Sequence, residues 1–338
     1  MFKRVLPLEY SMKICIIKLG AKGDVVRTLC ILPALKKKFP KSEITWITKD
    51  NIKQIFEGNL YVNELLTIPC SVNKKFDILY NFDIEDDATI LAKEIKADKK
   101  YGFYSENGYA MAFNLGAEYY INTMFDDELK KNNRKTYQEM MFEAAELDYE
   151  KEWCGVYLNE KDKKYAIEFV EKNGIKEKLI GIHMGAGSRW PSKAWHPDRI
   201  KEFVIQVKKK GFGVLLFGGP NEIESHAELV DELKRENIKV YQNNPNNTDK
   251  EFASLIDLCY FIVCSDSYAL HIALALKKKT IGLFFCTSPW EVEGYGLLTK
   301  VISPILKDFF PERSDEYNEE LVKSIKVNDV INLINNKE

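Results

Sequence analysis

The sequence has little net charge, few histidines, no closely paired cysteines and no long apolar run. Its 338 residues contain 49 lysines and arginines against 51 aspartates and glutamates. Neither half is basic, which excludes a nucleic-acid or membrane-surface module built on a positive patch. No stretch is long and apolar enough to span a membrane, and no repeat of about 20 to 50 residues indicates a solenoid.

The seven cysteines form no C-x-x-C pair, and several lie in apolar, strand-like runs. An odd number of unpaired cysteines predicts reduced thiols in the cytoplasm rather than a disulfide framework. Zinc would need cysteines and histidines in closer clusters, so we expect no structural metal. We also expect no cofactor. The first 20 residues carry basic side chains but only a short, interrupted apolar stretch, which does not predict a secretion signal.

Short apolar runs alternate with helix-length segments along most of the chain. In the first half we expect strands at 13–19, 43–48 and 78–82, helices at 25–39 and 134–147, and an irregular, aromatic-rich segment at 102–120. After a polar helix at 158–173, strands and helices alternate regularly from 179 to 285. This pattern predicts two α/β domains with doubly wound parallel sheets. The expected domains are 12–157 and 175–310, with one amphipathic helix over 316–335 in a C-terminal segment, 315–338.

The most informative segment is LIGIHMGAGSRWPSKAWHPDRI, residues 179–200. A strand ends at His183, a loop with Gly185, Gly187 and Ser188 follows, and Lys193 precedes a new helix. Free backbone N–H groups and a helix N-terminus both favour an anion. A dinucleotide fingerprint would need a third glycine where Trp190 stands, so the loop favours a nucleotide-linked donor over NAD.

A second candidate lies at the end of the first strand, where Asp24 follows Gly20 and Gly23. Asp24 is either the N-cap of a helix or a general base that accepts a hydroxyl proton. Position alone does not separate the two roles.

Further candidates follow the strands of the second half, and each has an ordinary structural alternative. Glu222 is suited to ribose hydroxyls, but also to the first turn of a helix. His183 and His271 suit a phosphate or a buried hydrogen bond, and Asp266 and Ser267 suit an anion site or a helix cap. Thr287 suits a ligand wall or a helix start. The acidic run 83–87 is a weak cation motif, which we interpret as a solvated helix start and leave outside the site.

Together these pieces resemble glycosyltransferase family 9, the ADP-heptose lipopolysaccharide heptosyltransferases. The opening resembles the family's strand, G-D-V, helix and proline, with Gly23, Asp24 and Val25 as the matching triplet. The family's H-x-G-A-G-S…K-x-W pattern is matched by His183, residues 185–188, Lys193 and Trp195. The resemblance covers residues 12 to about 306.

The resemblance implies a GT-B fold, with two Rossmann-like domains facing across a cleft and a last helix that packs back toward the N-terminal domain. It implies inverting, metal-independent transfer of a heptose or related sugar from a nucleotide diphosphate, ADP-heptose above all, to a lipopolysaccharide core or other glycan acceptor. Asp24 would be the base and Lys193 would stabilise the diphosphate, while the remaining candidates would bind the donor. The implied location is cytoplasmic, with at most peripheral contact with the inner membrane, and without a nucleic-acid partner.

Two positions depart from the family pattern, because Tyr268 and Cys286 stand where the family usually has glycine. These departures keep two alternatives open. One is a catalytically silent protein of the same fold that binds a sugar nucleotide. The other is a sugar-nucleotide epimerase of the same architecture, which would need no acceptor.

Overall fold

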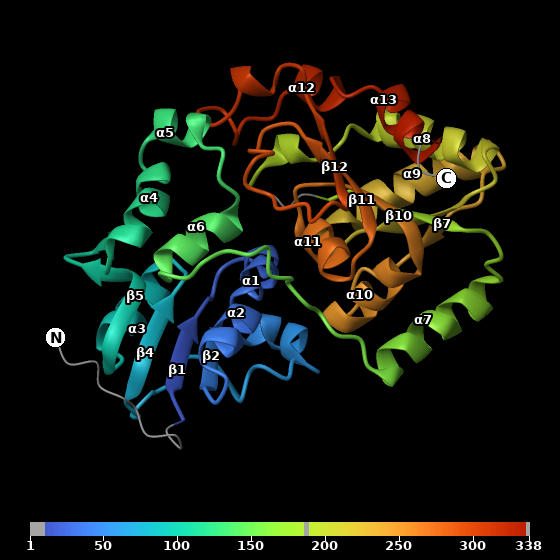
Figure 1. The fold of residues 1–338 in the computed structure, drawn as a ribbon. Coiled ribbons are helices and arrows are strands. Elements are labelled where there is room, and N and C mark those ends of the chain that lie inside the picture. Colours follow the sequence, from blue (N-terminus) through green and yellow to red (C-terminus); the bar gives the residue numbers. More distant parts are fainter. Residues whose placement is uncertain (1–10, 186–188, 336–338) are drawn as a thin grey trace. The chain divides into compact units, whose positions relative to one another are not determined.

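The protein, seen here as a computed structural model, forms two compact units, and the structure describes residues 11–185 and 189–335. The first unit comprises Met1–Leu129 and Lys135–Gly155, and the second comprises Lys130–Arg134 and Val156–Glu338. Each unit has its own sheet with helices on both faces (Figure 1). The two doubly wound α/β units predicted from the alternating pattern are confirmed.

The described strands of the first unit form one sheet in the order β3-β2-β1-β4-β5-β6. All neighbours are parallel except β5 and β6. The elements are β1 (Lys13–Ile17), α1 (Lys22–Thr28), α2 (Ile31–Lys38), β2 (Glu43–Lys49), the 3₁₀ helix η1 (Asp50–Phe56), β3 (Glu64–Ile68), β4 (Phe76–Asn81), α3 (Asp86–Glu94), β5 (Ala97–Glu106), β6 (Tyr109–Ala112), α4 (Leu115–Thr123), α5 (Asp127–Asn132) and α6 (Tyr137–Ala144).

The helix predicted over 25–39 is two helices, because α1 ends at Thr28 and α2 begins at Ile31. Pro33 lies in the first turn of α2, where its missing N–H costs no hydrogen bond. In a continuous helix, the ring of Pro33 would clash with the carbonyl group of Leu29. The break therefore follows from a proline inside the apolar pattern.

The segment 102–120, predicted as irregular, is ordered. It contains the end of β5, all of β6 and most of α4. The strands pair in an antiparallel hairpin whose turn residues, Asn107 and Gly108, have φ of 52° and 82°. Asn-Gly is the preferred pair for such a turn, because both central residues need positive φ. The expectation of an irregular segment is therefore wrong.

The second unit repeats this topology, with the described strands in the order β12-β11-β10-β7-β8-β9 and every neighbouring pair parallel. Both sheets have the strand order of dinucleotide-binding folds, in which ligands bind where the order reverses. The elements are α7 (Glu160–Asn173), β7 (Leu179–His183), the 3₁₀ helix η2 (Pro191–Lys193), α8 (Pro197–Lys209), β8 (Gly213–Phe217), the 3₁₀ helix η3 (Pro220–Glu222), α9 (Ile223–Arg235), β9 (Tyr241–Gln242), α10 (Asp249–Leu258), β10 (Cys259–Ser265), α11 (Tyr268–Ala275), β11 (Lys279–Phe284), β12 (Leu298–Ile302), the 3₁₀ helix η4 (Leu306–Asp308), α12 (Glu319–Lys323) and α13 (Val327–Asn335).

The single helix predicted over 316–335 is also wrong, since the segment forms α12 and α13. Its apolar side chains pack with those of α8, α9 and the sheet in the core of the second unit. Leu321, Ile325 and Val330 are fully or almost fully buried in this core. The return of this segment toward the first unit stays a prediction, whereas its part in the second core is observed.

Candidate functional site

Two of the predicted donor residues of the second unit meet where the strand order of its sheet reverses, between β7 and β10. His183 ends β7, and Ser267 follows β10 as the N-cap of α11. The His183 Nδ1 and Ser267 Oγ atoms are 3.3 Å apart. Two loops that are distant in the sequence are thereby joined at the carboxyl ends of neighbouring parallel strands, where α/β sheets bind ligands.

The environment of His183 keeps its imidazole neutral. Burial, reinforced by the nearby His226, lowers the pKa of His183 from 6.5 to about 4. At neutral pH the ring therefore carries one N–H donor and one acceptor nitrogen. It can take part in a hydrogen bond with Ser267 or a ligand, but it contributes no positive charge.

The positive charge of this site comes from Lys193, the last residue of η2, which follows the glycine loop. Its Nζ atom is 3.4 Å from Oδ2 of Asp266, and the side chains are 14% and 19% exposed. Oδ1 of Asp266 is 3.7 Å from Nε2 of His271. The structure thus brings together three of the predicted residues, in an order of cation, carboxylate and imidazole.

The C-terminal segment holds the loop that carries Lys193. The hydroxyl of the fully buried Ser192 donates to the carbonyl oxygen of Glu316 at 2.7 Å and accepts from the backbone N–H of Asn318 at 2.9 Å. The indole N–H of Trp195 donates to the carbonyl oxygen of Ile325 at 3.2 Å. These contacts fix the backbone on both sides of the lysine.

Glu222 lies directly against the start of the glycine loop. Its Oε2 atom accepts a hydrogen bond from the backbone N–H of Gly219 at 2.7 Å. A Cβ atom at Gly185 would overlap Cδ and Oε1 of Glu222 and lie 2.9 Å from its Cγ. A side chain at position 185 would therefore displace the Glu222 carboxyl group, which is a reason for glycine beyond the approach of a phosphate. Gly187 and Ser188, also predicted to bind the donor, lie outside the described residues.

Tyr268, the first departure from the family pattern, directs its ring toward α10. Its hydroxyl is 3.1 Å from Oδ1 of Asp249, and its ring stacks on Phe252 with 5.6 Å between the centroids. Burial, and then the Asp249 carboxylate, raises the pKa of Tyr268. The ring thus packs between α10 and α11.

Cys286, the second departure, is a buried thiol close to the charged group. Burial raises its pKa to about 12, with Lys193 opposing the shift and Asp266 adding to it. The next residue, Thr287, is half-buried. The thiol therefore stays protonated beside the lysine and contributes no charge.

In the first unit, Asp24 lies in the first turn of α1. It makes no side-chain hydrogen bond as a cap, since the N-cap position is Ala21. Its Oδ1 atom is 2.9 Å from Nη2 of Arg27, and the carboxylate side chain is 35% exposed. The guanidinium of Arg27 lies 3.7 Å from the centroid of the Tyr137 ring, which is fully buried. Of the two roles left open for Asp24, the N-cap is thus excluded.

Lys18 and Asp83 were not predicted as site residues, yet they lie at the reversal of the first sheet. Lys18 Nζ is 3.3 Å from Oδ2 of Asp83, and the side chains are 5% and 3% exposed. The interpretation of the acidic run as a solvated helix start is therefore wrong for Asp83. Within residues 11–185 and 189–335, no group of three or more histidine, cysteine or acidic side chains is arranged to hold a metal ion.

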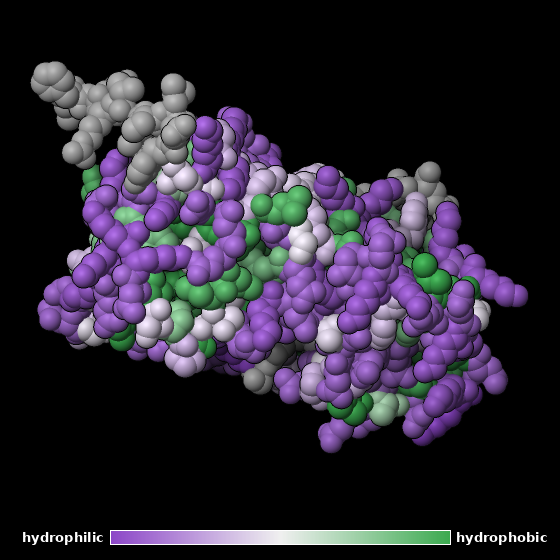
Figure 2. Space-filling model, turned by 90° about the horizontal axis from the view of Figure 1, so that it is seen from below, coloured by the Kyte–Doolittle hydropathy of each residue, from purple (hydrophilic) through white to green (hydrophobic). Residues whose placement is uncertain are grey.

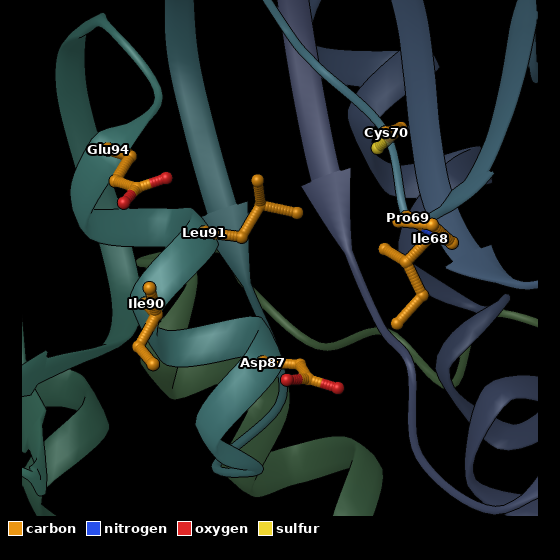
Figure 3. A pocket seen from close by; sticks show the side chains of 7 residues that line it. All are labelled: Ile68, Pro69, Cys70, Asp87, Ile90, Leu91 and Glu94. Carbon is orange, nitrogen blue, oxygen red and sulfur yellow. The ribbon is translucent and has the colours of Figure 1, made fainter.

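A separate cavity of about 340 Å³ opens between α3 and the segment that follows β3. Figure 3 shows side chains from both sides of it, including Leu91 on α3 and Ile68 at the end of β3. Asp87 and Glu94 add carboxylates to an otherwise mainly apolar lining. Among the described residues predicted for the donor or the base, none is part of this lining.

The surface adds no sign of a membrane-spanning element. Figure 2 shows hydrophilic residues over most of the face presented there, with hydrophobic residues in smaller areas. On the part of the chain that the structure describes, no helix has both the length and the apolar character needed to cross a bilayer.

Comparison with known proteins shows to which class of enzymes this sequence and this fold belong. The sequence model of "Glycosyltransferase family 9 (heptosyltransferase)" matches residues 71–320. The chain therefore belongs to glycosyltransferase family 9, and it is a glycosyltransferase of the heptosyltransferase type with a GT-B fold.

Individual relatives extend the match over nearly the whole chain. The lipopolysaccharide core heptosyltransferase OpsX of Haemophilus influenzae is 22% identical over 311 residues, which are 87% of this chain and 85% of the relative. A family 9 glycosyltransferase of Veillonella parvula has a similar fold, with a TM-score of 0.77, 18% identity and 98% of each chain covered. The ADP-heptose lipopolysaccharide heptosyltransferase II of Escherichia coli follows with a TM-score of 0.70, 18% identity, and 96% and 98% covered.

Proposed function

We propose that this protein transfers a heptose, or a closely related sugar, from a nucleotide diphosphate to a lipopolysaccharide core or other glycan acceptor. ADP-heptose is the first candidate donor, since it is named for the similar E. coli enzyme. The observation that carries the proposal is the cluster of Lys193, Asp266 and His271 beside the start of α11. An ammonium group and the N-terminus of a helix are suited to a leaving diphosphate.

In this proposal, the second unit holds the donor and the first unit supplies the base. Lys193 neutralises charge that develops on the diphosphate as the glycosidic bond breaks. Glu222 accepts hydrogen bonds from the ribose hydroxyls. Inversion follows when the acceptor hydroxyl attacks the face of the sugar opposite the leaving group, and this displacement needs a base on that side. With the lysine and helix N–H groups on the diphosphate, we propose that no metal is required.

Asp24 is the best candidate for the base because it combines position with access. Its carboxylate is 35% exposed, whereas the neighbouring Asp83 carboxylate is 3% exposed. Only the former can meet the hydroxyl group of an acceptor. Arg27, paired with Asp24 and packed on Tyr137, limits the orientations that the carboxylate can adopt.

The test combines turnover with binding. The purified protein is incubated with ADP-heptose and heptose-deficient lipopolysaccharide, and ADP release and the mass of the product are followed, with and without a chelator. Asp24→Asn should reduce turnover by about 10² or more, the scale of general base catalysis, and leave ADP affinity nearly unchanged in calorimetry. NMR of the product reports the anomeric configuration.

Each alternative gives a different result. Full turnover by Asp24→Asn would remove this residue from the mechanism. Binding of ADP and ADP-heptose without transfer to any acceptor would support a silent binding protein. A rearranged sugar nucleotide formed without acceptor would support an epimerase. A mass-spectrometric screen of sugar nucleotides consumed by the protein identifies the donor if ADP-heptose is not used.

A further inference from the structure

The reversal of strand order in the first sheet is occupied by the protein's own ion pair. Lys18 directly follows β1, and Asp83 lies two residues after the end of the neighbouring strand β4. In a doubly wound sheet, this crevice is the usual place for a ligand. Here it contains a buried ammonium and a buried carboxylate 3.3 Å apart.

The Asp83 carboxylate also accepts hydrogen bonds from the backbone of the loop after β1. Its Oδ2 atom accepts hydrogen bonds from the N–H groups of Leu19 at 2.9 Å and Gly20 at 2.6 Å. Its Oδ1 atom accepts from the N–H of Glu85 at 3.1 Å. The Asn81 side chain in turn holds the Asp83 backbone, with Nδ2 2.9 Å from its carbonyl oxygen and Oδ1 3.0 Å from its nitrogen. Hydrogen bonds therefore hold both the carboxylate and the backbone of Asp83.

These contacts continue directly into the turn that carries Asp24. A Cβ atom at Gly20 would lie 3.1 Å from both Asp83 Oδ2 and Lys18 Nζ, so the loop passes closely over the ion pair. The next residue, Ala21, accepts a hydrogen bond at its carbonyl oxygen from the backbone N–H of Asp24 at 2.9 Å. Only one residue thus separates the clamped Gly20 from the start of α1.

The ion pair is also linked to Asp24 through the side chains of Tyr137 and Arg27. Lys18 Nζ is 5.8 Å from the centroid of the Tyr137 ring, and the guanidinium of Arg27, the ion-pair partner of Asp24, lies on that ring. Burial opposes the charge of Lys18 but, with Asp83 beside it, the pKa of Lys18 is raised overall. Burial likewise opposes the charge of Asp83, but Lys18 and the three N–H groups lower its pKa overall. Both groups are therefore charged at neutral pH.

We propose that Asp83, together with Lys18, is a positioning residue for sugar transfer, which fixes the loop before α1 so that Asp24 is held ready for the acceptor hydroxyl. This inference rests on the proposed role of Asp24 as the base. It gives the acidic run a function other than cation binding. Reacting groups that are misplaced by about 1 Å lose up to about 10² in rate, so a small shift of this loop is sufficient to slow the reaction.

The test is Asp83→Asn, with Asp162→Asn as the matched control. Asp162 is also a buried carboxylate that accepts a backbone hydrogen bond, from Asn159 at 2.9 Å, but it caps α7 in the second unit. Asp83→Asn should reduce kcat about 10- to 100-fold, with the KM for ADP-heptose and the Kd of ADP nearly unchanged. Asp162→Asn should lower stability without changing kcat. If Asp83→Asn does not fold, the double variant Lys18→Met/Asp83→Asn leaves no unpaired buried charge and is measured instead.

Hydrogen exchange supplies a readout that does not depend on turnover. The backbone amides of Leu19 and Gly20 should exchange about 10-fold faster in Asp83→Asn, because they lose their charged acceptor, and at the wild-type rate in Asp162→Asn. Unchanged exchange, or unchanged kcat, would overturn the positioning role of Asp83. If Asp24→Asn is inactive while Asp83→Asn transfers normally, only this inference falls. If Asp24→Asn transfers normally, the proposed base falls, whatever the exchange rates show.

Discussion

Replacing Gly185 by alanine tests whether Glu222 binds the nucleotide. The new Cβ atom would overlap the Glu222 carboxyl group, which must then turn away from its position beside the loop. The clash involves a flexible side chain rather than backbone, so the protein should remain folded. The displaced carboxylate loses its 2.7 Å hydrogen bond from Gly219 and its proposed contact with the ribose. A charge-assisted hydrogen bond contributes about 1.5–3 kcal/mol, so ADP should bind about 10- to 150-fold more weakly.

Calorimetric titration with ADP of four proteins separates the causes: wild type, Gly185→Ala, Glu222→Ala and the double variant. If the methyl group acts only by displacing Glu222, it should have almost no further effect once that side chain is absent. Equal losses in both backgrounds would show that the methyl group obstructs the ligand itself. Wild-type affinity in Gly185→Ala would refute the proposed contact of Glu222 with the ribose.

Two further predictions concern His183 and Tyr268. The pKa of His183 is lowered in the folded state, so its contribution to stability is present above pH 6.5 and is lost as the pH falls toward 4. Between pH 7 and pH 5, the wild type should lose at most about 2 kcal/mol more of its unfolding free energy than His183→Gln, as measured by urea unfolding; parallel losses would contradict the shift. Tyr268→Phe should cost about 1 kcal/mol through the lost contact with Asp249, with no change in ADP affinity, because the ring packs away toward α10. Weaker ADP binding by this variant would place the hydroxyl in the donor site.

Three strands of the first sheet, β1, β2 and β4, and the second sheet as far as β11 could be predicted from sequence, because apolar periodicity reports which faces are buried. The errors have local causes that this periodicity does not report. Pro33 divides a continuous apolar pattern into two helices, and the pair Asn107 and Gly108 turns an aromatic-rich segment into a hairpin. Both signals were present in the sequence, as a proline inside a helical pattern and as an Asn-Gly pair between strand-like residues.

The site was partly predictable for a different reason. Loops at the carboxyl ends of parallel strands meet at one edge, so Lys193, Asp266 and His271 could be grouped before their distances were known. The direction of a side chain cannot be predicted in this way, and Tyr268, which stands where the family usually has glycine, packs on Phe252. The partnership of Lys18 with Asp83 was also missed, since it joins residues 65 positions apart through tertiary contacts. A lysine that ends an apolar strand was its only signal.

The anchoring of the Lys193 loop by the C-terminal segment has a consequence for synthesis on the ribosome. The core of the second unit contains both Ile180 and Ile334, and Ser192 is hydrogen-bonded to Glu316 and Asn318. The core and the anchored loop are therefore complete only when almost the whole chain has left the ribosome. The first unit, by contrast, ends at Gly155, and residues 130–134 within that span belong to the second unit. A nascent chain can therefore fold its first unit early, whereas the second unit, which contains the Lys193 loop, is completed last.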